Sequence, residues 1–329
     1  NAVAGSAVVL DVNTGEVLAM VNQPSFNVND RKQLQPQATR NRAVTDVFEP
    51  GSVMKPFAVA SALETGRCAP TTPIDTTPGR ISISGHTISD HHNYGPNDLT
   101  RLITKSSNVA ATKDALDLDP EHMWNTLDRF GFGDVTGSGF PGESAGVLRN
   151  HRRWRRVEQA TIAYGYGISV TVLQLAEAFA ALADEGRLRR PSLVMGANNP
   201  PVSVLDPEIA RQVADMLETV TGPEGTGKAA RVKNYRVSGK TGTSRKASAA
   251  GYASRYIASF AGFAPSSNPR LVAVAVVNDP SGEAYYGGLV AAPLFSTVME
   301  GALRLLNVPP DDYQVMVTQA ETDGSGVEP

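Results

Sequence analysis

The chain has 329 residues, 41% of them apolar, so it is long enough to bury the core of one large domain or two modest ones. Its formal net charge of −3 provides no broad positive field, which argues against a general nucleic-acid-binding role. Its one cysteine, Cys68, excludes an intrachain disulfide and a zinc site built from several thiolates.

The N-terminal part of the chain predicts a hairpin, a polar loop and a helix. Apolar runs at residues 7–10 and 16–20 flank the sequence Asp-Val-Asn-Thr-Gly, which is typical of a β-hairpin. Residues 27–42 are rich in Asn, Gln and Arg and have little periodicity, so we expect a surface loop there. From Ser52 onward the apolar spacing predicts a buried helix that ends at Gly66.

The remaining segments predict further helices and strands. Helical periodicity is found at residues 107–116, 120–130, 172–183, 207–220 and 293–306. Strands are expected at residues 236–239, 257–263 and 271–277, and the last is apolar on both faces and therefore central in its sheet. Because the first and last segments supply the strands, we expect an α/β (α+β) fold: a mainly antiparallel sheet of about five strands flanked by helices, with an all-helical subdomain inserted between the N-terminal hairpin and the C-terminal strands.

The two ends of the chain carry separate expectations. Residues 1–20 lack the basic start and long apolar run of a signal peptide and look like the interior of a longer protein, so we expect a membrane anchor upstream. The longest apolar run, residues 271–277, is far shorter than the roughly 20 residues that span a bilayer, so we expect no part of the chain to cross a membrane. Residues 311–329 are acidic and rich in small residues, which predicts a disordered tail after a domain at residues 1–310.

The segment FEPGSVMKPF places Ser52 and Lys55 three residues apart, directly after a Pro-Gly turn. On a helix this spacing brings the lysine amine within reach of the serine hydroxyl. A serine hydroxyl becomes a strong nucleophile only when a base takes its proton, and lysine can be that base when burial or a nearby cation lowers its pKa. Ser-x-x-Lys also occurs by chance in long chains, so the pair alone does not establish a catalytic site.

Two further motifs add weight to this pair. Lys-Ser-Ser-Asn puts Ser106 and Asn108 at a predicted helix start, where helix capping is the simpler explanation if the motif is considered alone. Lys-Thr-Gly-Thr begins at Lys240 on a predicted edge strand, where glycine lets a ligand backbone come close and the lysine and threonines can receive a carboxylate. The order Ser-x-x-Lys, Ser-x-Asn, Lys-Thr-Gly is that of penicillin-binding proteins and related β-lactamases, and its joint occurrence by chance is small.

On these motifs the chain resembles the class B penicillin-binding proteins, most closely the division-specific transpeptidases. The segments FEPGSVMKP, KSSN, AYGYG, GKTGTS, FAGFAP and YYGG match that family and cover nearly the whole chain up to about residue 307. The resemblance implies the fold that these enzymes share with serine β-lactamases and a serine-type D-Ala-D-Ala transpeptidase with neither cofactor nor metal. It also implies a location at the periplasmic face of the bacterial inner membrane.

The resemblance further implies a role for each motif residue. Ser52 would attack the carbonyl between the two terminal D-alanines of a donor stem peptide and form an acyl-enzyme, with Lys55 as its base. Ser106, near Lys55 and Lys240, would pass the proton to the leaving amine. Asn108 would hold the acyl side chain and fix Lys55.

The strand motif and several aromatic residues would bind the substrate. The backbone amides of Ser52 and Thr243 would form an oxyanion hole, a kind of interaction that stabilises the transition state strongly. The segment Thr241-Gly242-Thr243 would receive the terminal carboxylate. Four tyrosines match aromatic positions of the family's cleft, with an ordinary core or surface role as the alternative: Tyr166, Tyr256, Tyr285 and Tyr286.

The implied partners are peptidoglycan stem peptides, β-lactam antibiotics and division-machinery proteins that include a membrane glycosyltransferase; nucleic acid is not expected. A hydrolase, either a β-lactamase or a D-alanyl carboxypeptidase, is the first alternative. A class A β-lactamase would need a water-activating carboxylate, for which Glu158 is the candidate, but its neighbours match the transpeptidase pattern and we interpret it as an ion-paired structural residue. A non-catalytic β-lactam sensor is the second alternative, although no linked signalling segment is visible.

Three other features have simpler explanations. Residues 222–228 match a phosphate-binding loop, but Ala229 replaces the Ser or Thr that would hold magnesium, and a helix precedes the loop. His91 and His92 are adjacent and no third ligand is apparent, so we expect loop residues rather than a metal site. The basic cluster, residues 149–156 (RNHRRWRR), is expected to be a solvated face, with contact to anionic peptidoglycan or a partner protein as the alternative.

Overall fold

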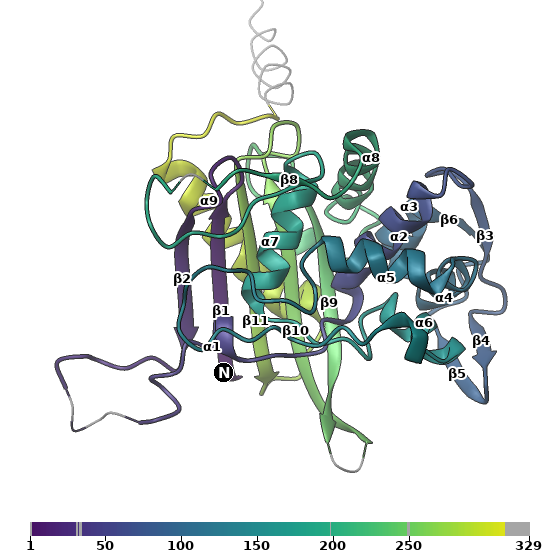
Figure 1. Ribbon diagram of the computed structural model, residues 1–329, viewed down its shortest axis with the longest axis horizontal. Helices are drawn as coiled ribbons and strands as arrows, with labels where there is room; N and C mark the ends of the chain where they lie inside the picture. Colours follow the sequence, from purple (N-terminus) through teal and green to yellow (C-terminus); the bar gives the residue numbers. More distant parts are fainter. Residues whose placement is uncertain (1, 31, 33–34, 198, 249–250, 313–329) are drawn as a thin grey trace, which may run out of the picture.

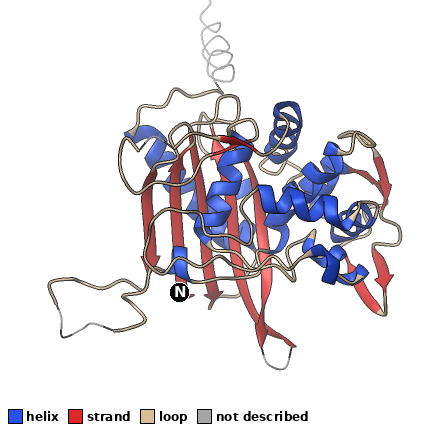
Figure 2. Ribbon diagram, in the orientation of Figure 1, coloured by secondary structure: helices blue, strands red, loops and turns tan. Residues whose placement is uncertain are grey.

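The computed structural model describes residues 2–30, 32, 35–197, 199–248 and 251–312. A five-stranded antiparallel sheet of strand order β2-β1-β11-β10-β9 forms its centre (Figures 1 and 2). Its strands are β1 (Ala2–Asp11), β2 (Val17–Gln23), β9 (Ser238–Ser248), β10 (Gly251–Ala264) and β11 (Leu271–Pro280). The predicted fold class and N-terminal hairpin are confirmed. The predicted tail, residues 311–329, lies outside the described residues from position 313 onward.

Strand β11 occupies the middle of the sheet, as its uninterrupted apolar run predicts. Val272 and Val274 pack into the core on one face, while Ala273 and Ala275 pack into a second core on the other face. Both faces are covered, so every position of the strand is selected to be apolar and the alternation of a half-exposed strand is lost.

Two helices cover the faces of the sheet (Figure 2). Helix α7 (Val172–Ala183), buried along its whole length, packs on β1, β10 and β11. Helix α9 (Gly287–Leu305) packs on β9, β10 and β11 through a side that includes Ala291, Phe295 and Met299. Helix α9 is long and apolar enough to cross a membrane, but it lies against the sheet as a core helix does.

Helix α9 begins at Gly287, six residues before the predicted start at residue 293. Pro293, where the predicted helix begins, lies inside the helix. The proline leaves the carbonyl of Leu289 without an N–H partner, and both residues lie on the exposed side, where water can serve. The helix start packs tightly on β9, because a Cβ at Gly287 would lie 2.1 Å from the carbonyl oxygen of Gly242.

Strand β9 lies at the edge of the sheet, as predicted, but its bounds differ from the expected residues 236–239. The apolar pattern predicts a strand only up to residue 239, where the sequence becomes polar. The polar segment from Lys240 to Ser248 nevertheless continues the strand, because its backbone pairs with β10. Edge pairing depends on backbone hydrogen bonds and not on side-chain hydrophobicity, so periodicity did not detect it.

The segment between the hairpin and the C-terminal strands is mostly helical. Its helices are α1 (Arg42–Thr45), η2 (Gly51–Met54), α2 (Lys55–Glu64), α3 (Leu99–Lys105), α4 (Asn108–Leu116), α5 (Pro120–Arg129), η3 (His151–Arg153), α6 (Arg156–Ile162), α7, α8 (Pro207–Glu218) and η4 (Lys228–Ala230). The expectation that it is wholly helical is wrong. It also contains three two-stranded sheets, formed by β3 (Pro73–Asp75) with β6 (Pro96–Asp98), β4 (Arg80–Ile83) with β5 (His86–Ser89), and β7 (Arg187–Leu188) with β8 (Val202–Ser203). These strands have two to four residues, too few to produce a readable alternation.

Candidate active site

Ser52 lies on a tight turn between the helical part of the molecule and the edge of the sheet. It belongs to the 3-10 turn η2, and the α-helix that was expected to start near it, α2, begins at Lys55. Gly51 adopts a φ of +63°, and its N–H donates to the carbonyl of Gly165 at 3.1 Å. A Cβ at Gly165 would lie 2.1 Å from the carbonyl oxygen of Gly51. The serine turn is therefore held by backbone packing that only glycine permits.

Lys55 is fully buried beneath the serine. Its Nζ lies 3.0 Å from Ser52 Oγ, 2.8 Å from Asn108 Oδ1 and 3.1 Å from Ser106 Oγ, and it also donates to the Ser106 carbonyl. The two carbonyl-type oxygens can only accept hydrogen bonds, whereas the two hydroxyls can also donate. A neutral Lys55 can therefore donate to both carbonyl oxygens and still accept the proton of Ser52.

The electrostatic surroundings favour the neutral amine. Burial, followed by the positive charge of Lys240, lowers the pKa of Lys55 well below its ordinary 10.5, and the carboxylate of Asp90 opposes this change. Burial also lowers the pKa of Lys240 from 10.5 to about 7. Among the described residues neither lysine forms an ion pair, so the charge of Asp90 offsets only part of the cost of burying two positive charges.

Ser106 bridges the two lysines. Its Oγ lies 2.9 Å from Lys240 Nζ and 3.1 Å from Lys55 Nζ. The residue lies between α3 and α4 in the left-handed conformation, with φ 60° and ψ 41°, and Ser107 caps α4 by accepting from Ala110 N–H. Capping therefore explains Ser107 and leaves the hydroxyl of Ser106 free to face the amines.

The Lys-Thr-Gly-Thr segment on β9 forms the opposite wall. Thr241 Oγ1 and Thr226 Oγ1 are 2.8 Å apart, and Thr243 Oγ1 accepts from the N–H of Gly287 at 2.9 Å. Gly242 does not line the groove; a Cβ there would lie 2.2 Å from Ser259 Oγ, so its function in this strand is close packing. Thr241 and Thr243 thus line the same groove as Ser52 from the edge of the sheet.

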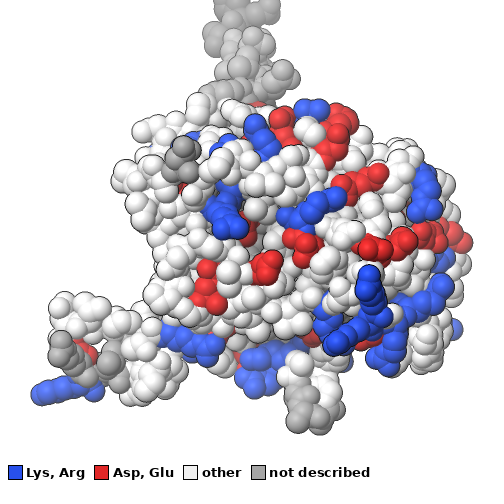
Figure 3. Space-filling model, viewed as in Figure 1, with Lys and Arg blue, Asp and Glu red and all other residues white. Residues whose placement is uncertain are grey.

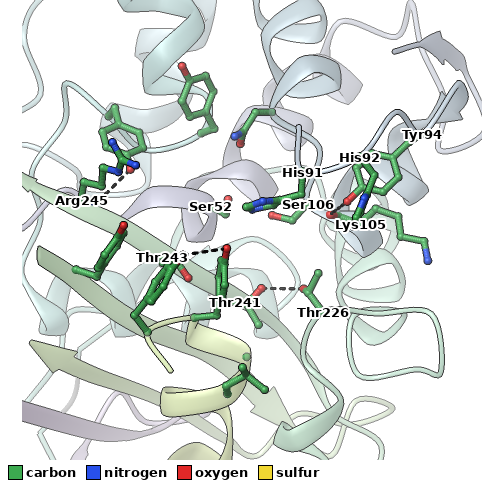
Figure 4. Close-up of a pocket in the computed structure, with 18 residues that line it drawn as sticks. Ser52, His91, His92, Tyr94, Lys105, Ser106, Thr226, Thr241, Thr243 and Arg245 are labelled. Carbon is green, nitrogen blue, oxygen red and sulfur yellow. Dashed lines mark hydrogen bonds between the residues drawn. The ribbon is translucent and has the colours of Figure 1, made fainter. Parts of the chain in front are cut away.

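A groove of about 760 Å³ runs past Ser52 and contains the remaining predicted residues (Figure 4). All four predicted tyrosines line it: Tyr166, Tyr256, Tyr285 and Tyr286. Tyr285 stacks between the other two aromatic rings of its wall, with ring centroids 4.0 Å from Tyr256 and 4.5 Å from Tyr286. Tyr166 accepts from the backbone N–H of Arg245 at 3.1 Å.

Several residues of the groove were not predicted. His91 lies across from Tyr286, with ring centroids 5.7 Å apart, and Thr226 comes from the loop that imitates a phosphate-binding loop. Arg245 and Lys105 also line the groove. Lys105 adjoins Ser106 in the KSSN motif and Thr226 lies in the loop at residues 222–228, but neither pattern indicates that these side chains line the groove.

Glu158 is an ion-paired structural residue, as predicted. It binds Arg149 at 2.7 Å and Arg155 at 3.2 Å, and its carboxylate accepts from the backbone N–H of Arg155 at the start of α6. Arg152 and Arg153 are exposed, and Figure 3 shows Lys and Arg side chains gathered where α6 lies in Figure 1. In the described part of the chain no group of three or more His, Cys, Asp or Glu side chains could hold a metal ion.

Comparisons with known proteins identify the family of the chain. Residues 5–300 match the model of the penicillin binding protein transpeptidase domain. The chain is 44% identical over 312 residues to the peptidoglycan D,D-transpeptidase FtsI of Escherichia coli K12, covering 94% of this chain and 52% of that protein. It is 42% identical over 316 residues to the probable peptidoglycan D,D-transpeptidase PbpC of Pseudomonas aeruginosa, covering 94% and 55%.

A solved structure has the same fold. The apo transpeptidase domain of Burkholderia pseudomallei penicillin-binding protein 3 superposes with a TM-score of 0.86 at 44% identity, covering 94% of this chain and 90% of that one. The chain spans about half the length of the two curated relatives described above. The resemblance identified from the motifs is confirmed, and the chain belongs to the penicillin-binding protein transpeptidase domain family.

Proposed function

We propose that the chain is a serine-type peptidoglycan D,D-transpeptidase of septal cell-wall synthesis and a target of β-lactams. The observation that supports this most is the Ser52 hydroxyl at 3.0 Å from a buried lysine amine, at the floor of an open groove. A deprotonated amine within hydrogen-bond reach is the arrangement that a general base requires. The family membership supports the same conclusion.

In the first half-reaction, Ser52 Oγ attacks the carbonyl carbon of the penultimate D-alanine while Lys55 Nζ takes the hydroxyl proton. The N–H groups of Ser52 and Thr243 would stabilise the oxyanion. The proton then passes by way of Ser106 to the leaving amine, so that the C–N bond breaks and free D-alanine departs. Lys240, at 2.9 Å from Ser106 Oγ, would orient that hydroxyl.

The groove also suits the rest of the substrate. Thr241 and Thr243 would receive the terminal carboxylate, and the tyrosine wall would hold the stem peptide. Asn108 would position both the acyl side chain and Lys55. In the second half-reaction an amine from another stem attacks the ester, so that a C–N bond forms and the C–O bond to Ser52 breaks, and the proton that the amine loses passes to Ser52 Oγ.

A hydrolase would instead need a group that activates water at the ester. The residues that line the groove in the described part of the chain include no Asp or Glu. This composition favours a long-lived acyl-enzyme over rapid hydrolysis.

Localisation and partners extend this proposal. The protein would act on the periplasmic side of the bacterial inner membrane, with residues 1–310 as one catalytic domain, together with division-machinery proteins that include a membrane glycosyltransferase. The names of the relatives support cell-wall synthesis, and the family match at residues 5–300 supports the single domain.

Intact-mass spectrometry after exposure to benzylpenicillin tests the proposal. We expect one covalent adduct that persists for hours, no adduct in Ser52→Ala, and normal labelling in Ser254→Ala, which changes an exposed serine on β10. Labelled Ser52→Ala protein would contradict the assignment of the nucleophile. Release of the adduct within seconds would indicate a hydrolase, and absence of any adduct on the wild type would contradict the proposed function.

A further inference from the structure

Beyond its charge effect on Lys55, Asp90 makes three hydrogen bonds to the segment that carries Ser106 and Asn108. Its Oδ1 accepts from the backbone N–H of Asn108 at 2.5 Å and of Val109 at 3.1 Å, and its Oδ2 accepts from the Ser107 hydroxyl at 2.6 Å. Asp90 directly follows β5, on the loop that continues to His91 in the groove wall.

These hydrogen bonds fix the start of helix α4. The first N–H groups of a helix have no partner within it, and Asp90 satisfies two of them from outside. Ser107 accepts from Ala110 N–H while donating to Asp90, so the cap and the carboxylate form one network. A carboxylate at a helix N-terminus is also favoured by the helix dipole.

The fixed helix start determines where two site residues point. Asn108 is the first residue of α4, and Ser106 lies two residues before it in the left-handed conformation. Both side chains bond to Lys55 Nζ, at 3.1 Å from Ser106 Oγ and 2.8 Å from Asn108 Oδ1. A shift of the Asp90 carboxylate would therefore displace both partners of the base.

Asp90 also contributes charge. The charges that act most on Lys55 come from Lys240 on β9, which disfavours the protonated amine, and from Asp90, which favours it. The loop that holds Asp90 has three other titratable groups. These are His91, His92 and Tyr94, and all three face the groove. Asp90 thus provides the negative charge beside a site that otherwise carries two buried amines.

We propose that Asp90 is a positioning residue for acylation, which holds the Ser106–Asn108 turn against Lys55 by hydrogen bonding and balances the charge of the two lysines. The proposal rests on the proposed function, since it assigns Asp90 to the same reaction. Asp90 does not line the groove, so it acts through Ser106, Asn108 and Lys55 and not on the substrate.

Two substitutions separate geometry from charge. In Asp90→Asn the amide oxygen can keep both backbone hydrogen bonds, and its NH2 group can donate to the Ser107 hydroxyl, so the turn is retained while the charge is lost. In Asp90→Ala both are lost. Asp98→Asn is the matched control, because Asp98 caps the preceding helix α3 through Arg101 N–H and has no bond to the site.

The second-order rate constant of acylation by a chromogenic penicillin, measured against pH, is the first test. We expect Asp90→Ala to lose on the order of 10²-fold at its pH optimum, as a displaced catalytic constellation does. Asp90→Asn should stay within about threefold of wild type at its optimum, because the turn that positions the catalytic groups is kept. Its acid limb should move to lower pH, because removal of the negative charge lowers the pKa of Lys55 further. Asp98→Asn should match the wild type in both respects.

The contrary results are equally definite. A wild-type rate in Asp90→Ala, or an unmoved acid limb in Asp90→Asn, would overturn the proposal, and Asp90→Asn alone decides if Asp90→Ala does not fold. An NMR titration of the lysine side chains in the uncomplexed protein provides an independent test, in which the midpoint of Lys55 must fall in Asp90→Asn. If the wild type is not acylated at all, the proposed function fails, while the NMR titration still decides the effect of Asp90 on Lys55.

Discussion

Replacement of Lys240 by methionine should make the protein more stable and less active. The Lys240 amine is fully buried, and its hydrogen bonds go to Ser106 Oγ at 2.9 Å and to the Thr241 carbonyl at 3.3 Å. The fall of its pKa from 10.5 to about 7 corresponds to about 5 kcal/mol, at 1.36 kcal/mol for each tenfold change in proton affinity. Loss of two hydrogen bonds removes about 2 kcal/mol of this gain. We therefore expect the free energy of unfolding of Lys240→Met to exceed that of the wild type by about 3 kcal/mol at pH 7.

The pH dependence gives the sign of the effect. Between pH 7 and 10.5 the unfolded chain binds more protons at this position than the folded chain does. Stability of the wild type therefore rises with pH in this window, and the same contribution is absent from Lys240→Met. The advantage of the variant should shrink as the pH rises from 7 toward 10, in urea unfolding followed by circular dichroism.

The same substitution should slow acylation. Ser106 loses a charged donor, which is worth about 1.5 to 3 kcal/mol or roughly 10- to 150-fold in rate. Loss of the positive charge also raises the pKa of Lys55, so the acid limb of the pH profile should move to higher pH. Lys233→Met, at an exposed lysine, is the control and should alter neither property. A Lys240→Met protein that is less stable than the wild type at pH 7 and has the same pH slope would refute the reasoning from burial.

Three further substitutions test other parts of the structure. Gly165→Ala should lower the free energy of unfolding by about 3 kcal/mol or more and abolish labelling by penicillin, because residue 165 has a φ of +83° and its Cβ would strike the backbone of the serine turn. Thermal melts measure the change in stability. Gly301→Ala, in open space inside α9, is the control and should raise the stability by up to about 1 kcal/mol. Asp114→Asn should be more stable than the wild type at pH 8 by about 1 to 3 kcal/mol. Burial, followed by the charge of a neighbouring carboxylate, raises the pKa of Asp114 to about 8, and one of its buried oxygens has no hydrogen-bond partner. The contribution of Asp114 to stability is fully present below its ordinary pKa and is lost as the pH rises through 8. The difference in stability between Asp114→Asn and the wild type should therefore disappear near pH 4, as measured by urea titration. Replacement of Arg152 and Arg153 by Glu should leave the acylation rate unchanged, because both lie outside the groove.

Each of these expectations has a contrary result. Labelling of Gly165→Ala at the wild-type rate would mean that the close approach of the two turns is not required. Equal stability of Asp114→Asn and the wild type at every pH would mean that water reaches the carboxylate. Slower acylation after charge reversal in the basic cluster would place that surface nearer to the reaction than the fold suggests.

The chain's local patterns determined the catalytic motifs and much of the secondary structure. The spacing of Ser52 and Lys55 spans one helical turn, and such a spacing can be recognised without a structure. The bounds of α7 and the central place of β11 follow from runs of apolar residues, which reflect burial directly. Composition and order of the motifs were enough to identify the family.

Only the tertiary structure decided how the site is held together and what charge it carries. Lys55 and Lys240 are 185 positions apart in sequence, yet both bond to Ser106, and the pKa of each lysine depends on removal from water by the whole surrounding fold. Asp90, Thr226 and His91 reach the site from loops whose local sequence does not indicate a role there. Hydrogen bonding between distant segments leaves no periodic trace in a sequence, because periodicity records only which face of one element is buried.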